Sequence, residues 1–198
     1  MDNSRKKSKF SMIKNLYSIS NIYERLIKPI LKEDKGVDAE CLTNISLKLL
    51  AFCSNHKEAG FISNYLGELR KELCITDKKL IQEICGINFP NPLGLAAGFD
   101  KNGIAANIWQ DFGFGFSELG TVTQYAQPGN PKPRLFRISN EQAALNRMGF
   151  NNNGADLLLK SLMKQNIKKK VDRENNCLGI NFGKSKITSI ANATDDYI

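Results

Sequence analysis

The stretch LGLAAGFDKNG, residues 93–103, sets its smallest side chains directly before an acid, a base and an amide. Its apolar start predicts a short buried strand, and the polar residues that follow begin a loop. Ala96, Ala97 and Gly98 offer almost no side-chain bulk, so a flat ring system could approach the backbone closely. A lysine at the end of a buried strand needs an anion or an ion-pair partner. A plain surface turn is the alternative, and this stretch alone does not decide between the two.

Two further apolar runs extend this pattern along the chain. GFGFSELGTVT predicts a buried strand centred on residues 116–122, and CLGINFG predicts another. A helix between them has its apolar positions at Leu157, Leu158, Leu159 and Leu162, and Asn151 or Asn152 is expected to cap it. Residues 191–198 are expected to form the beginning of a further helix. Strands that alternate with helices in this way predict an α/β fold.

A hairpin is expected to interrupt the alternation, with PRLFRI and AALNRM as its strands and residues 139–141 as its turn. In an α/β barrel the chemistry lies on the loops that follow the carboxyl ends of the strands. AAGFDKN, GTVTQYAQPGNPKPR and NFGKSK each occupy such a position. We therefore expect these three loops to converge on one ligand.

The second polar motif is NRMGFNNNG, residues 146–154. It gathers amide side chains and one arginine around a glycine, and amides can both donate to and accept from the edge of a planar heterocycle. A helix-entry loop with capping asparagines is the alternative interpretation.

The first third of the chain is predicted to be helical. Apolar residues recur at helical spacing from Leu16 to Ile30, and residues 38–40 open a second helix whose apolar positions include Leu42, Ile45, Leu49, Leu50 and Cys53. A third helix covers about residues 60–74. The pattern by itself favours a small bundle packed on the main domain over a hairpin on a membrane surface.

Composition excludes several classes of function. The 198 residues carry 28 Lys and Arg against 20 Asp and Glu, but the basic residues form only two short runs, at residues 5–9 and 168–170. No alternation of basic and aromatic residues points to a nucleic acid partner. Five cysteines without a CxxC pair and a single histidine argue against a metal site and favour free thiols in a reducing compartment. No apolar stretch is long enough to span a bilayer.

Five motifs taken together resemble one enzyme family. NPLGLAAGFDKNG, ELGTVT, QPGNPKPRLFR, LNRMGFNNNG and LGINFGKSK are similar, in this order, to the N-terminal half of class 2 dihydroorotate dehydrogenase. That family comprises the membrane-associated, quinone-reducing, FMN-dependent enzymes of pyrimidine synthesis. The resemblance runs from about Asp38 to Tyr197 and implies the first part of a TIM (β/α)8 barrel, incomplete in this chain and preceded by a small helical domain.

The resemblance implies a role for particular residues. FMN would lie against Ala96, Ala97, Gly98, Phe99 and Asp100, with polar contacts from Thr121 and Asn181. Substrate-contacting positions would be Lys101, Asn146, Arg147, Met148, Gly149 and Phe150, and Arg137 would lie near the inner end of the quinone tunnel. Ser185 departs from the asparagine that is common in the GK-K loop, and Cys41 replaces a common histidine.

The implied reaction oxidises dihydroorotate to orotate. A serine base removes a proton from C5 while hydride passes from C6 to FMN, and the reduced FMN then gives its electrons to a quinone. The serine of the family lies in an N-x-S-S-P-N-T motif after the next strand, so it is expected beyond Ile198. Too few residues follow Gly86 to make eight strands, and the chain is expected to be a fragment that is inactive by itself.

The implied organisation has three parts: a flexible basic tail at residues 1–14, a helical membrane and quinone-tunnel domain at 15–80, and the truncated FMN-binding barrel at 81–198. Peripheral association with the cytoplasmic side of the cell inner membrane is expected. The mitochondrial inner membrane is the alternative, because residues 4–20 are rich in Ser and Lys and free of acids. Other functional alternatives are a non-enzymatic remnant, a subunit completed by a separately encoded second half, and a different FMN-dependent barrel oxidoreductase.

Overall fold

The computed structural model describes residues 38–168 and 177–198, and these fall into two compact units. The β5–β6 unit contains the described residues 38–43 and 132–147, and the main unit contains 44–131 and the described part of 148–198. The predicted helix from Leu16 to Ile30 and the predicted tail at residues 1–14 lie outside the described residues. The three-part division of the chain at residues 14 and 80 stays a prediction.

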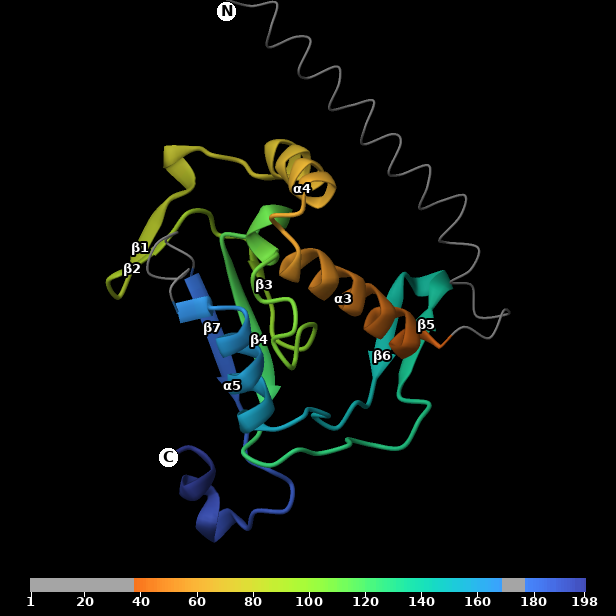
Figure 1. Ribbon diagram of the computed structural model, residues 1–198. Helices are drawn as coiled ribbons and strands as arrows, with labels where there is room; N and C mark the ends of the chain where they lie inside the picture. The colour runs from red at the N-terminus through yellow and green to blue at the C-terminus, as the bar shows by residue number, and fades with distance from the viewer. Residues whose placement is uncertain (1–37, 169–176) are drawn as a thin grey trace, which may run out of the picture. The chain divides into compact units, whose positions relative to one another are not determined.

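The main unit is built on a parallel sheet of three strands, β3 (Gly94–Leu95), β4 (Phe116–Val122) and β7 (Cys177–Phe182), with β4 in the centre (Figure 1). The strands predicted at residues 116–122 and in CLGINFG are confirmed. These three strands do not close a barrel. The described chain is therefore a mixed α/β fragment with helices at its N-terminal side.

Strand β4 shows why this sheet forms. Burial alternates along the strand as far as Leu119, and the register with β7 then shifts between Gly120 and Val122. Leu119 and Val122, three residues apart, are both almost completely buried. They pack in one cluster with Leu158 of helix α5 (Ala155–Lys164), which lies beside β7 in Figure 1. The helix therefore covers the sheet as an α/β connection does.

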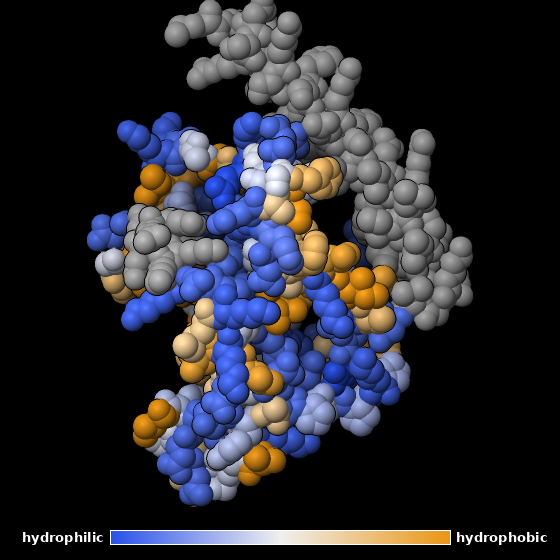
Figure 2. All heavy atoms as spheres, viewed as in Figure 1, coloured by the Kyte–Doolittle hydropathy of each residue, from blue (hydrophilic) through white to orange (hydrophobic). Residues whose placement is uncertain are grey.

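The exposed side of α5 is also partly apolar. Leu157, Leu159 and Met163 are each more than half exposed. Figure 2 shows hydrophobic residues in orange interspersed with hydrophilic ones on the surface, in keeping with these exposures. The leucine run of α5 thus supplies one side of the helix to the core and leaves the rest in contact with solvent.

The predicted cap of α5 is wrong. The cap residue is Gly154, with a φ of +86° that favours glycine, and no side chain caps the helix. Asn152 instead lies two residues earlier, where its Oδ1 accepts a hydrogen bond of 2.8 Å from the Gly154 N–H. The predicted C-terminal helix is present as a 3₁₀ helix, η6 (Ile190–Asp196).

Helices α3 (Ala39–Asn55) and α4 (Gly60–Leu73) match the predicted second and third helices. Leu47 and Leu66 pack with Ile108 and Trp109, which lie at the start of the short helix η4 (Trp109–Phe112). A buried carboxylate, Asp111, adds ion pairs to the same region from Lys57 at 2.5 Å and from Arg70. Apolar packing and charge together therefore hold α3 and α4 against η4.

One element was missed in the sequence. An antiparallel hairpin joins β1 (Gln82–Ile84) to β2 (Ile87–Phe89), after the 3₁₀ helix η3 (Lys78–Leu80). Its two-residue turn, Cys85–Gly86, has positive φ at both positions, which suits the right-handed twist of a hairpin. Cysteine stands at the first position, where asparagine, aspartate or glycine is usual, so the sequence lacks the common signal for such a turn.

The β5–β6 unit contains the predicted hairpin, β5 (Leu135–Ile138) and β6 (Ala143–Asn146), with Ser139–Glu141 (η5) as its turn. Glu40 and Arg134 form a buried ion pair there, with two hydrogen bonds of 2.9 and 2.6 Å. Because the two bonds are parallel, the pair joins the first turn of α3 firmly to the segment before β5.

Substitution of Leu119 tests the packing of β4 on α5. Leu119→Ala is expected to lower the free energy of unfolding by about 3 kcal/mol, because it leaves a cavity at a fully buried position. Leu159→Ala, at a side chain that is 57% exposed, is the matched control and should change the same quantity by less than about 0.5 kcal/mol. Urea unfolding followed by circular dichroism measures both, and equal losses would contradict this core.

Acid titration tests the Glu40–Arg134 pair. Hydrogen bonds from Arg134 lower the pKa of the Glu40 carboxyl. The pair therefore stabilises the folded state at pH values above the usual range of a glutamate, and this stabilisation is lost as the pH falls through the lowered pKa. Urea unfolding from about pH 7 to about pH 3 should show the wild type more stable than Glu40→Gln at neutral pH, with a gap that narrows in acid. If the difference in free energy of unfolding between the wild type and Glu40→Gln does not change with pH, the ion pair does not contribute as described.

Candidate functional site

The carboxyl ends of the three parallel strands meet at Gly120. The Gly98 N–H, just beyond β3, donates 2.7 Å to the Gly120 carbonyl, and Asn181 of β7 pairs with Gly120 on the other side. A Cβ at Gly120 would lie 2.5 Å from the Asn181 carbonyl oxygen, and the φ of +102° also favours glycine. Backbone contacts alone therefore bring the ends of β3, β4 and β7 close to one another.

Open space lies beside Gly98. A Cβ built on Gly98 would meet no atom within 4 Å, and Ala96 and Gly98 are exposed. Phe99 is 38% exposed and packs edge-to-face on Trp109 with ring centroids 5.6 Å apart. The backbone at Gly98 is therefore sterically open to the edge of a flat ring, as the sequence predicts.

The Asp100 side chain forms its hydrogen bonds with nearby residues that follow it in the chain. Its two carboxylate oxygens accept hydrogen bonds from the Ile104 N–H at 2.9 Å, the Ala105 N–H at 3.0 Å and the Trp109 indole at 3.3 Å. The side chain is fully buried, and burial raises the pKa of its carboxyl although these bonds act in the opposite direction. Asp100 thus fixes the loop at residues 96–108 (the β3 loop), and any contact with a cofactor would come from its backbone.

Thr121 and Asn181, both predicted to contact FMN, contact each other. The Thr121 hydroxyl donates 2.6 Å to Asn181 Oδ1, and Asn181 Nδ2 donates 2.9 Å to Glu118 Oε1. The two bonds fix which way the Asn181 amide faces. Glu118 was not predicted as a site residue, because a glutamate inside an apolar strand gives no local signal of its partner.

Lys101 connects the β3 loop to the asparagine-rich motif. Its Nζ donates 2.7 Å to Asn151 Oδ1, and Asn102 Oδ1 accepts from the Asn153 N–H at 2.9 Å. The two polar motifs singled out in the sequence, 50 residues apart, therefore lie side by side in the main unit. We call residues 148–153 of this motif the amide loop.

Buried Asn152 anchors the amide loop to the end of β4. Its Nδ2 donates 2.9 Å to the Thr123 hydroxyl, and its backbone N–H and carbonyl both pair with Gln127 at 3.0 Å. Met148 and Gly149 of the same loop are half-buried, whereas Phe150 is 64% exposed. The segment at residues 123–127 (the β4 segment) is thus held to the amide loop by hydrogen bonds.

The predicted ligand residues fall in both units. Asn146 and Arg147 belong to the β5–β6 unit, where Arg147 is exposed, donates to the Pro133 carbonyl at 3.1 Å and lies over the Phe136 ring at 5.8 Å. Arg137, the predicted quinone-tunnel residue, lies half-buried on β5 of that unit. The other predicted residues belong to the main unit: Ala96, Ala97, Gly98, Phe99, Asp100, Lys101, Thr121, Asn181, Met148, Gly149 and Phe150.

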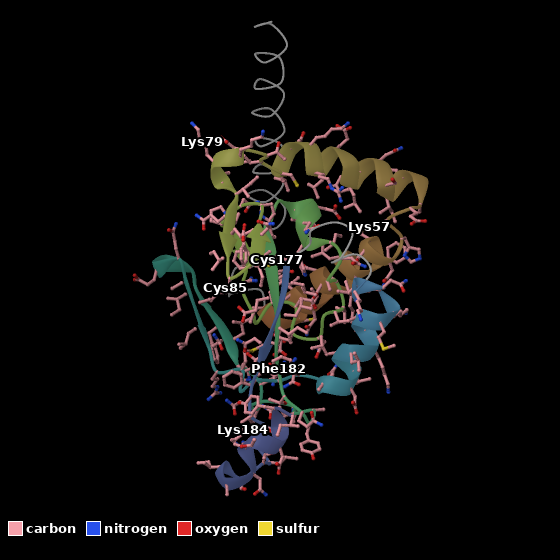
Figure 3. All side chains as sticks on the ribbon, turned by 90° about the vertical axis from the view of Figure 1, so that its left-hand side faces the viewer. Lys57, Lys79, Cys85, Cys177, Phe182 and Lys184 are labelled. Carbon is pink, nitrogen blue, oxygen red and sulfur yellow. The ribbon has the colours of Figure 1, made fainter. Side chains whose placement is uncertain are left out.

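The loop after β7, residues 183–188 (the β7 loop), is held by its own polar contacts. Figure 3 labels Phe182 and Lys184, where β7 ends and this loop begins. Ser185 is buried, accepts from the Tyr125 N–H at 3.2 Å and donates its own N–H to the Asp196 carboxylate. Ser185, the serine that departs from the family pattern, therefore links the β4 segment, the β7 loop and η6 by hydrogen bonds.

Within residues 38–168 and 177–198, no three His, Cys, Asp or Glu side chains gather where they could hold a metal ion. In the same described ranges, no helix combines the length and the apolar character that crossing a bilayer requires.

The meeting point at Gly120 can be tested by adding one methyl group. Gly120→Ala is expected to lower the free energy of unfolding by about 2 kcal/mol or more, because the new Cβ meets the Asn181 carbonyl and the φ is unfavourable. Gly67→Ala is the control: this helical glycine has no atom within 4 Å of a built Cβ, so alanine should raise stability by about 1 kcal/mol. If urea unfolding shows a neutral Gly120→Ala, the close approach of the three strand ends is wrong.

Comparisons with known proteins agree with this architecture. The sequence profile of the family described as "Dihydroorotate dehydrogenase" matches residues 79–198. Dihydroorotate dehydrogenase (quinone) from Prochlorococcus marinus (strain MIT 9313) is 50% identical over 182 residues, which cover 92% of this chain and 46% of that protein. The same enzyme from Trichormus variabilis (strain ATCC 29413 / PCC 7937) is 47% identical over 181 residues, 90% of this chain and 46% of that protein.

A solved structure is also similar. The crystal structure of dihydroorotate dehydrogenase in complex with ferulenol from Eimeria tenella superposes with a TM-score of 0.68 at 37% identity, over 87% of this chain and 42% of that one. The chain spans about half the length of the curated relatives it matches. With the family profile covering more than half of its residues, the chain belongs to the dihydroorotate dehydrogenase family, as a quinone-type member that corresponds to the N-terminal portion of its relatives.

Proposed function

We propose that this chain carries the FMN-binding and dihydroorotate-binding loops of a quinone-dependent dihydroorotate dehydrogenase. The complete reaction would oxidise dihydroorotate to orotate and pass the electrons through FMN to a membrane quinone. The observation that supports this most directly is the meeting of three strand-end residues, Gly98, Thr121 and Asn181, around Gly120. Because the chain spans about half of its relatives, the activity is proposed for an enzyme that includes the other half.

The residues present suit a flavin. The open space beside Gly98 would admit the edge of a planar ring, and the small side chains of Ala96 and Ala97 leave the adjacent backbone accessible. Asn181 keeps hydrogen-bonding capacity beyond its bonds to Thr121 and Glu118, since Nδ2 carries a second hydrogen and Oδ1 a second lone pair. These groups would hold the polar edge of FMN in one orientation.

When bound, FMN supplies the capacity to accept two electrons from a substrate and to pass them to a second acceptor. This chain would contribute a fixed positive charge, because Lys101 Nζ is held by Asn151 in the main unit. A cation at this position stabilises negative charge on a reduced ring or on a bound anion. Lys101 would therefore bind and orient, rather than move protons.

The substrate would contact the asparagine-rich motif. Dihydroorotate is an anion with amide groups around its ring, so it needs both a cation and side chains that donate and accept. In the main unit we assign Lys101, Met148, Gly149 and Phe150 to it. The substrate contacts of Asn146 and Arg147, which belong to the β5–β6 unit, stay a prediction from the sequence. The exposed Phe150 ring would cover an apolar face of the bound ring.

The quinone would come from the membrane. Quinones partition into lipid, so a peripheral enzyme needs an apolar entrance, which the N-terminal helical region with Arg137 at its inner end would provide. We place the protein on the cytoplasmic side of the cell inner membrane, with the mitochondrial inner membrane as the alternative.

A chimaera tests the proposal. This 198-residue chain replaces the matched 46% of the Prochlorococcus marinus enzyme, and the absorbance of bound FMN is recorded without oxygen. We expect the chimaera to retain FMN, to bleach on addition of dihydroorotate and to regain its colour with a soluble quinone. Lys101→Ala should slow the bleaching by about a hundredfold or more, which corresponds to loss of a charged contact.

The control is Lys160→Ala, at an exposed lysine on α5 outside the site, which should bleach like the parent. A folded chimaera that retains no FMN, or that retains FMN but does not bleach, would show that these loops do not serve this reaction.

A further inference from the structure

We propose that Gln127 is a positioning residue that holds the amide loop and the β7 loop at a fixed spacing. This inference rests on the proposed function in one respect only: it treats the amide loop as the part that contacts the substrate. Gln127 was not predicted as a site residue, and no role is assigned to it above beyond its backbone pairing with Asn152.

The contacts of the Gln127 side chain point in two directions. Its Nε2 donates to two carbonyls of the amide loop, Gly149 at 3.3 Å and Phe150 at 3.1 Å. Its Oε1 accepts from the Lys186 N–H of the β7 loop at 3.0 Å. One planar amide group therefore spans the two loops, and all of these residues belong to the main unit.

The chemistry of this position requires an amide. The two carbonyls need a donor and the Lys186 N–H needs an acceptor, and glutamine supplies both on one rigid group. A glutamate could serve only Lys186, a lysine could serve only the carbonyls, and a methionine of similar length could serve neither. Substitutions of Gln127 can therefore remove the hydrogen bonds to the amide loop and to the β7 loop separately.

The backbone of Gln127 cannot move independently of these contacts. Its N–H and carbonyl both pair with Asn152 at 3.0 Å, and two residues earlier the Tyr125 N–H donates to Ser185 Oγ at 3.2 Å. The β4 segment is therefore joined to both loops, and the half-buried Gln127 side chain extends from a fixed base. A change at one loop is transmitted to the other through a short path of hydrogen bonds.

Hydrogen exchange resolved to single amides in the 198-residue chain tests this coupling. Exchange of the Lys186 N–H is expected to rise about tenfold in Gln127→Met and Gln127→Lys, and to stay near wild type in Gln127→Glu. Exchange in the amide loop should show the other pattern, with a rise of about tenfold in Gln127→Met and Gln127→Glu but not in Gln127→Lys. A residue with a merely structural role would affect both loops alike in all three variants.

The matched control is Gln124→Met, three residues earlier at an exposed side chain. It should leave both loops unchanged. The buried amides of β4 report in the same data whether each variant is folded, so the glutamate and lysine variants keep the test decisive if methionine disrupts the unit. Unchanged exchange at Lys186 in folded Gln127→Met would overturn the proposal.

Orotate is the probe for the link to the site, and it is added to the FMN-loaded chimaera with the Prochlorococcus marinus enzyme, with and without the Gln127→Met substitution. In the wild type, orotate should slow exchange in the amide loop and also at Lys186, and in Gln127→Met it should protect the amide loop only. If orotate protects neither loop of the wild type, the proposed substrate site fails. The exchange pattern of the variants without orotate then still decides whether Gln127 couples the loops.

Discussion

The close approach of three backbone strands at Gly120 is the constraint on which the candidate site depends. The Gly98 N–H donates to the Gly120 carbonyl, and the Asn181 carbonyl lies where a Cβ of residue 120 would be. Because only glycine fits there, the ends of β3, β4 and β7 come within reach of a single small ligand. The side chains next to these backbone contacts, Thr121 and Asn181, are brought together as a consequence.

Buried polar side chains then hold the loops that leave the strands. Asp100 satisfies the backbone of the β3 loop, Asn152 joins the amide loop to the β4 segment, and Ser185 joins the β7 loop to the same segment. Each of these side chains uses its hydrogen bonds within the protein, because a buried polar group without a partner is costly. Their neighbours Phe150 and Lys101 have exposed and half-buried side chains, respectively.

Much of this architecture could be predicted from the sequence, because its signals are local. Apolar runs indicated β4 and β7, helical spacing indicated α3 and α4, and the turn at residues 139–141 indicated the β5–β6 hairpin. The loops expected to share one ligand include residues that do meet in the main unit, among them Thr121 and Asn181.

The rest depends on contacts between distant residues. Gly154 replaces the predicted asparagine cap of α5 because Asn152 is needed by Thr123 and Gln127. The ion pairs of Asp111 with Lys57 and Arg70 join residues more than 40 positions apart, which no short window of sequence reveals. The sequence does not reveal the partners of Gln127 for the same reason, because Gly149 lies more than 20 positions away and Lys186 almost 60.

We propose that the ends of β3, β4 and β7 form one ligand site. Its most direct test is a nuclear magnetic resonance titration of the isotopically labelled chain with FMN, which follows the backbone amides of Gly98, Thr121 and Asn181. All three signals are expected to shift together and to fit one dissociation constant, whereas amides of α4 stay unchanged. Shifts confined to other regions, or different dissociation constants for the three strand ends, would contradict it.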